Sequence, residues 1–200
     1  MVDRKTKRQK QAENTKKNIF EVASKLMEKR GFESVTVDDI CKIVGIAKGG
    51  FYHHFPYKGE LIMEIYRNID SEFIDIIEKL PAEISLRERI IFSNCFIAQV
   101  ANEKGHEFLR EIYKGQLDWG TNFFLSQNRP IYQHIFLNVK KNLEGRDISR
   151  FPSAHDITKM LILAARGVIY DWLLDRGSYD IELFMKQTIS LLYDGIFKSD

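Results

Sequence analysis

The residues best suited to chemistry lie in one short stretch, residues 36–58. Several of them donate N–H or O–H groups, which bind phosphate oxygens, and a lysine can also donate to the edge of a guanine base. Two adjacent glycines, Gly49 and Gly50, let the backbone approach another surface closely. The stretch therefore suggests contact with DNA. The candidate DNA-binding residues are Thr36, Lys48, Gly49, Gly50, Tyr52, His53, His54 and Lys58.

Two short helices joined by a tight turn are expected to position these residues. The first is predicted over 37–44, because apolar residues recur there at spacings of three and four. Thr36 and Asp39 approximate a capping box at its start, and Gly45 suits its end. The second is predicted over 47–54. This arrangement is a helix-turn-helix, whose second helix enters the major groove of DNA. The alternative is an ordinary helix pair inside an all-α core.

The motif resembles the DNA-binding segment of the TetR/AcrR family of bacterial transcriptional regulators. Two positions depart from the family pattern, since Ala47 replaces the usual Ser or Thr and Gly50 replaces a common Thr or Ser. Both departures remove hydroxyls that could cap the second helix or contact DNA. With the preceding helix, the resemblance covers residues 1–65. The matching positions are Thr36, Val37, Ile40, Cys41, Val44, Gly45, Ile46, Gly49, Phe51, Tyr52, His54, Phe55 and Lys58.

The resemblance implies an all-α fold, with an N-terminal three-helix DNA-binding head on a C-terminal helical body. It implies a homodimer on double-stranded DNA at a palindromic operator, since a two-fold dimer presents two recognition helices about 34–36 Å apart. It also implies repression that a small-molecule effector relieves, and abundant Phe and Ile favour an apolar or aromatic effector. Effector binding is expected to shift the helix over 58–80 and to separate the two heads.

The distribution of charge agrees with a DNA-binding head. The net charge of the chain is only +2. Residues 1–58 hold 13 Lys and Arg against 7 Asp and Glu, a net +6, whereas the remainder holds 17 against 21, a net −4. A basic front on an acidic body suits a head that binds DNA and a body that does not. The alternative, a non-specific architectural DNA-binding protein, is expected to have a basic body as well.

Other classes of protein find little support. Cys41 and Cys95 are far apart, which suggests neither a disulfide framework nor a zinc site. The N-terminus lacks the apolar core of a signal peptide, and no apolar run approaches the roughly 18 residues that span a bilayer. We therefore expect a cytoplasmic protein with no membrane partner, no metal and no cofactor. An all-α enzyme is the remaining alternative, but phosphate-binding Gly loops, G-x-S-x-G and H-E-x-x-H motifs are missing.

Hydrophobic periodicity predicts about nine helices and no strand. We expect a flexible basic arm over 1–13, the DNA-binding domain over 14–57, a connecting helix over 58–80, and a ligand-binding and dimerisation domain over 81–200. The arm could reach DNA phosphates or remain a solvated tail. The predicted helices span 14–30, 37–44, 47–54, 58–80, 86–102, 106–117, 130–143, 156–176 and 180–197, with a loop or short helix in 118–128.

The last two predicted helices are apolar on more than one side, which indicates two packing partners. One side can face the core of the chain and the other a second copy, with small residues permitting close approach. The alternative is full burial within one chain. The candidate dimer residues are Leu163, Ala164, Gly167, Tyr170, Asp171, Leu174, Phe184, Thr188 and Leu191.

An effector pocket is expected among polar and aromatic residues on the apolar helix faces of the body, because ligand pockets are mostly apolar with a few placed polar groups. For each residue the alternative is surface exposure or an ordinary hydrogen bond in the core. The candidates are Asn94, Gln99, His106, Tyr113, Trp119, Phe123, His134, Arg166 and Tyr170.

Overall fold

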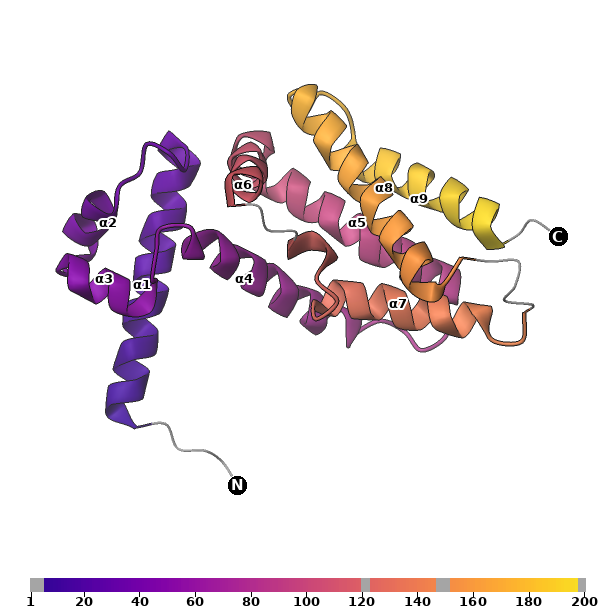
Figure 1. Ribbon diagram of the computed structural model, residues 1–200, viewed down its shortest axis with the longest axis horizontal. Helices are drawn as coiled ribbons and strands as arrows, with labels where there is room; N and C mark the ends of the chain where they lie inside the picture. Colours follow the sequence, from indigo (N-terminus) through magenta and orange to yellow (C-terminus); the bar gives the residue numbers. More distant parts are fainter. Residues whose placement is uncertain (1–5, 120–122, 147–151, 198–200) are drawn as a thin grey trace.

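The computed structural model describes residues 6–119, 123–146 and 152–197. These residues form nine α-helices, one short 3-10 helix and no strand, so the all-α prediction is confirmed. Figure 1 shows a small N-terminal head and a larger helical body. The helices are α1 (Lys7–Arg30), α2 (Val37–Val44), α3 (Lys48–His54), α4 (Glu60–Ile77), α5 (Leu86–Lys104), α6 (His106–Trp119), η1 (Phe123–Leu125), α7 (Pro130–Leu143), α8 (Ala154–Leu174) and α9 (Ile181–Phe197).

The head consists of α1, α2 and α3 (Figure 1). Each helix contributes apolar side chains to a common core. Ile19 of α1, Ile40 of α2 and Phe51 of α3 are fully buried there. The helices α2 and α3 have only 8 and 7 residues, so tertiary burial of their apolar faces stabilises them more than intrinsic helix propensity does.

The first helix begins earlier than expected, at Lys7 rather than Asn14. Thr6 and Gln9 form a capping box: Thr6 Oγ1 accepts from the Gln9 N–H at 3.2 Å, and Gln9 Oε1 accepts from the Thr6 N–H at 2.7 Å. The polarity of residues 7–13 suggested an arm, but a capped helix tolerates polar residues where it extends into solvent. Residues 1–5 of the predicted arm lie outside the described residues.

The helix α4 leads from the head into the body (Figure 1). It spans Glu60–Ile77, which is shorter at both ends than the predicted 58–80. Ile62 and Phe73 are buried at opposite ends of α4. The same rigid helix therefore packs against both parts of the molecule.

In the body, α7, α8 and α9 pack around α5. Phe96, Ile135, Leu161 and Ile189 come from these four helices and are almost wholly inaccessible to solvent. Within the described ranges, no helix combines the length and the apolar character needed to cross a membrane.

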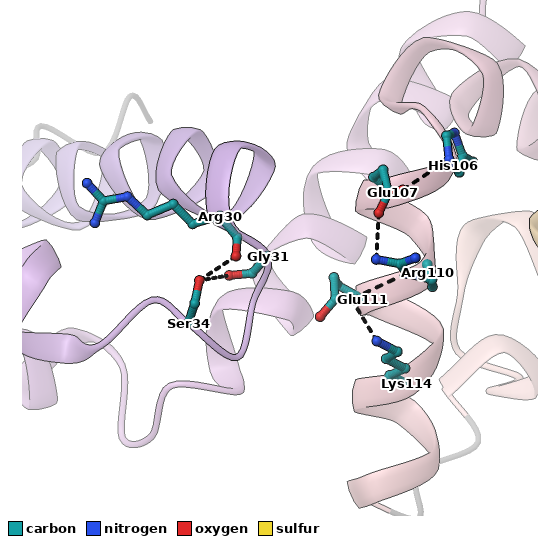
Figure 2. A network of polar contacts seen from close by, with 8 residues as sticks. All are labelled: Arg30, Gly31, Ser34, His106, Glu107, Arg110, Glu111 and Lys114. Atoms are coloured by element: carbon teal, nitrogen blue, oxygen red, sulfur yellow. Dashed lines mark hydrogen bonds and ion pairs between the residues drawn. The ribbon is translucent and has the colours of Figure 1, made fainter. Parts of the chain in front are cut away.

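The head also touches the body beside α6. Figure 2 shows the end of α1, where the Ser34 hydroxyl donates to the carbonyls of Arg30 and Gly31, facing a row of ion pairs along α6. A Cβ built on Gly31 would lie 3.8 Å from Cδ of Glu111, so head and body are in contact there. Movement of α6 or α4 would therefore be transmitted to the head.

Candidate nucleic-acid interface

The start of α2 is fixed by Thr36 and Asp39. Thr36 Oγ1 accepts from the Asp39 N–H at 3.1 Å, and Asp39 Oδ2 accepts from the Thr36 N–H at 3.0 Å. These hydrogen bonds confirm the predicted capping box, and those from Thr36 to the carboxylate lower the pKa of Asp39. Gly45 ends the helix with φ +77°, a conformation that favours glycine. DNA contact by the exposed Thr36 stays a prediction.

The helix α3 is anchored on one side and open on the other. Phe51 and Phe55 are fully buried, and their ring centroids lie 5.6 Å apart. Ala47 precedes the helix without a side-chain cap, as expected from the loss of the usual hydroxyl. The predicted DNA-binding residues on the solvent-exposed side of α3 are Lys48, Gly49, Tyr52 and His53.

The two glycines of α3 differ in their surroundings. A Cβ built on Gly49 would meet nothing within 4 Å, whereas one on Gly50 would lie 3.6 Å from Cβ of Ile46, an ordinary contact. Neither glycine is required by packing inside the protein. The open space above Gly49 is therefore available to an external surface.

Lys48 pairs with an acidic residue of the preceding helix. Its Nζ lies 2.8 Å from Oδ2 of Asp38, and both side chains are well exposed. The hydrogen bond to Asp38 raises the pKa of Lys48, so its ammonium is charged at neutral pH. An ion pair this exposed is weak, and a phosphate or a guanine edge can replace Asp38.

Lys58, a predicted phosphate contact, is held by hydrogen bonds within the protein. Its Nζ donates to the carbonyl oxygens of Phe32 at 2.8 Å and Val35 at 3.1 Å, and lies 4.1 Å from the centroid of the Phe32 ring. The ammonium thus ties the loop between α1 and α2 to the start of α4. The sequence did not indicate these partners, because they are distant from Lys58 along the chain. Contact of Lys58 with DNA stays a prediction.

His54 is a weaker candidate than its neighbour. It is half-buried, and its burial lowers its pKa, as do nearby His53 and Lys16. A neutral imidazole offers a hydrogen bond but no charge to a phosphate. His53 is the more accessible of the two.

Three of the candidate effector residues lie close together in the body. Tyr113 lines a small cavity of about 40 Å³. Burial raises the pKa of Tyr113 and the neighbouring Arg166 opposes that shift, which places the two side chains side by side. The Phe123 ring packs at a tilt against that of Tyr66, a second residue that lines the cavity, with 4.7 Å between the ring centroids.

The other candidates are dispersed. His134 Nδ1 lies 2.7 Å from the Ser93 hydroxyl, and burial lowers its pKa. Asn94 is fully buried and its Nδ2 donates to the Ile90 carbonyl at 2.8 Å. Gln99 and Tyr170 are exposed and His106 is half-buried, away from the cavity lining. The side chain of Trp119 lies outside the described residues. The nine candidates therefore do not form a single pocket.

Sequence reasoning missed a buried polar cluster beside the cavity. Arg129 precedes α7 and pairs with Asp70 of α4, and Gln116 of α6 donates to the Tyr66 hydroxyl. These polar and charged residues are buried. A signal was present for Asp70, because it lies four residues after Tyr66 and three before Phe73, on the apolar face of α4.

The candidate dimer residues form an exposed, largely apolar face on α8 and α9. Their most exposed large side chains are Leu191 at 75%, Leu174 at 66% and Tyr170 at 56%. A Cβ on Gly167 would meet nothing within 4 Å. Full burial within one chain is therefore wrong. Also predicted on this face are Leu163, Ala164, Asp171, Phe184 and Thr188, all exposed or half-buried, while exposed Met160 and Leu183 were missed.

No group of three or more His, Cys, Asp or Glu in the described parts of the chain is arranged to hold a metal ion.

Comparison with known proteins agrees with this geometry. Residues 19–65 match the family described as "Bacterial regulatory proteins, tetR family". The chain is 23% identical to the HTH-type transcriptional regulator AcrR of Shigella flexneri, over 96% of this chain and 92% of that protein. It is 24% identical to the HTH-type transcriptional repressor KstR2 of Rhodococcus jostii (strain RHA1), over 89% of each.

A solved structure shares the fold along most of the chain. It is the transcriptional regulator FadR from Bacillus subtilis in complex with stearoyl-CoA, with a TM-score of 0.64 at 14% identity, covering 90% of this chain and 98% of that one. The family match falls on the helix-turn-helix, and the fold match extends across the body. Residues 19–65 therefore match the helix-turn-helix segment of the tetR family, and the chain is similar along most of its length to proteins that are transcriptional regulators.

Proposed function

We propose that this protein is a ligand-responsive repressor that binds a palindromic double-stranded DNA operator as a homodimer and is released by a small molecule. The observation that carries the proposal is the outer side of α3. Lys48, Gly49 and Tyr52 are exposed there on a helix whose other side is anchored by Phe51. A rigid helix with exposed donors and an open backbone suits the major groove.

The exposed face of α8 and α9 supports dimerisation. Monomeric proteins rarely expose contiguous apolar surface without a partner for it. Burying Leu174 and Leu191 against a second copy would pair two heads by two-fold symmetry, which in turn requires a palindromic site.

The position of α4 supports release by an effector in the body. This helix joins both parts of the molecule, and its buried Tyr66 lines the cavity. A small molecule that binds better when α4 is displaced shifts the population toward heads spaced wrongly for adjacent major grooves.

The test is binding to the DNA upstream of the protein's own gene, measured against competitor DNA across a salt series. We expect tight binding that Tyr52→Ala abolishes. The matched control is Tyr132→Phe in the body, which should leave binding unchanged. Equal affinity for upstream and competitor DNA in wild-type protein would instead favour the architectural alternative.

A further inference from the structure

A buried ion pair joins α4 to the start of α7. Arg129 Nη2 lies 2.7 Å from Asp70 Oδ1, and Arg129 Nε lies 3.1 Å from Asp70 Oδ2, so the guanidinium engages both carboxylate oxygens. The Arg129 side chain is 7% exposed and that of Asp70 is 12% exposed. The two residues are 59 positions apart in the sequence.

Arg129 stands at the wall of an apolar cavity. The guanidinium carbon lies 4.8 Å from the centroid of the Phe123 ring and 5.4 Å from that of Tyr66. The cavity encloses about 40 Å³ between helices α4, α5, α6, α7 and α8. Its apolar lining includes Ile97, Val100, Leu109, Ile112, Ile131 and Ile169.

The charge of Arg129 must always be compensated. A guanidinium does not lose its proton in proteins, and a buried charge without a counter-ion is strongly destabilising. Asp70 supplies the counter-ion in this conformation. A carboxylate from outside has the same charge and can adopt the same bidentate geometry, so it can compensate Arg129 in place of Asp70 when the displaced Asp70 carboxylate becomes solvated.

We propose that the effector is a monocarboxylate with an apolar tail, whose carboxylate replaces Asp70 on Arg129 while its tail fills the adjoining cavity. The proposal rests on the proposed function, in which the body holds the effector. It names the chemical class of that effector and the residue that recognises it.

The same exchange of carboxylates explains how effector binding in the body would change the position of the head. A cavity of about 40 Å³ is far smaller than the roughly 300–1,000 Å³ typical of ligand pockets, so its walls must separate to admit the tail. Asp70, once displaced, must turn toward water, and it is already the more exposed partner. Both changes move α4, the helix that enters the head.

The test is calorimetric titration of the full chain, without DNA, using octanoate and decanoate below their micellar concentrations, with 1-octanol and 1-decanol as neutral partners. Wild-type protein should bind the carboxylates in preference to the alcohols. Asp70→Asn should bind them about tenfold more tightly or better, because no internal carboxylate competes. Arg129→Gln should lose the preference for carboxylate over alcohol.

Matched controls come from α4 itself. Asp75→Asn and Arg67→Gln each remove one exposed charge from the same helix and should leave the titrations unchanged. Because Asp70→Asn leaves a buried charge uncompensated, its melting temperature should fall and decanoate should restore it, whereas decanol should not. The double variant Asp70→Asn with Arg129→Gln removes both charges, and it should show no preference for carboxylates.

Three results would overturn the inference: alcohols binding as tightly as carboxylates, a double variant that retains the preference, or no binding of either carboxylate to wild-type protein. The titrations contain no DNA, so their outcome does not depend on whether the protein binds an operator. Carboxylate binding without specific DNA binding would refute the repressor, and the converse would refute only the effector class.

Discussion

In the proposed complex with DNA, Lys48 would have two competing anionic partners, Asp38 within the protein and the DNA outside it. The ion pair at 2.8 Å holds the lysine in place, but it also puts a carboxylate next to the surface that meets phosphate. In that complex Asp38 would oppose binding to any DNA, and only contacts specific to the operator would offset the repulsion. A residue of this kind improves discrimination at the expense of affinity.

We predict that Asp38→Asn binds competitor DNA severalfold more tightly than wild-type protein does. The affinity for the operator divided by that for competitor DNA should therefore fall. The physical reason is the loss of a negative charge facing the phosphates, together with the release of the Lys48 ammonium. Competition binding at several salt concentrations measures both effects. Asp75→Asn, on α4, is the control, and an unchanged affinity ratio in Asp38→Asn would contradict the prediction.

Because of the open space above Gly49, a side chain added there should change the stability of the fold and the affinity for DNA in opposite directions. We expect Gly49→Ala to stabilise the fold by up to about 1 kcal/mol, since alanine favours the helix and its Cβ meets nothing within 4 Å. The same methyl group should weaken binding to DNA, where the backbone approaches closely. Thermal unfolding and operator titration measure the two quantities.

Gly50→Ala is the matched control for this experiment. Its Cβ would contact Ile46 rather than open space, so it should stabilise α3 with a smaller loss of DNA binding. Equal losses in both variants would mean that the close approach is not at Gly49.

At the scale of elements, local signals predicted helices well and long-range contacts poorly. The bounds of α2 and α7 agree with the sequence, because Thr36, Gly45 and Pro130 mark their ends within a few residues. The start of α1 was missed although Thr6 and Gln9 form the same kind of box. The hydrogen bonds of Lys58 within the protein could not be predicted, since its partner Phe32 is 26 residues away.

The hydrogen bonds of Lys58 to Phe32 and Val35 give a prediction for the loop between α1 and α2. Lys58→Met should destabilise the head by about 1.5–3 kcal/mol, the usual loss for hydrogen bonds to a charged group. Well below its melting temperature, the folded variant should keep the salt dependence of DNA binding.

The comparison variant is Lys48→Met, which should reduce the salt slope by about one unit, as the loss of a phosphate or base-edge cation does. Denaturant unfolding and a salt series on both variants separate the two roles. A reduced slope in Lys58→Met would restore the original expectation of a phosphate contact.

At the scale of the whole molecule, hydrophobic periodicity predicted an all-α fold, but it did not predict which side chains meet in the interior. Helices apolar on two sides indicated a second partner, and the exposure of Leu174 and Leu191 agrees with that. The pairing of Asp70 with Arg129 depends on how α4 and α7 meet, which periodicity along each helix does not contain. The pair on which the proposed effector site rests could therefore not be predicted from the sequence, whereas the exposed side of α3, the proposed DNA-binding surface, could.

Gly167 tests whether the outer face of α8 and α9 joins two copies. A Cβ at this position meets nothing within 4 Å in the single chain, and leucine favours a helix more than glycine does, so Gly167→Leu should leave the monomer folded. In a dimer the new side chain would occupy the space into which the partner helix packs. We therefore expect sedimentation equilibrium to show monomers, and operator affinity to fall steeply because two heads no longer bind as one unit. Leu137→Asp changes a side chain that is 57% exposed and lies on α7 rather than on α8 or α9, and this variant should remain dimeric. If Gly167→Leu stays dimeric while Leu137→Asp dissociates, the copies meet through α7, and the spacing of the heads must be set by that helix instead.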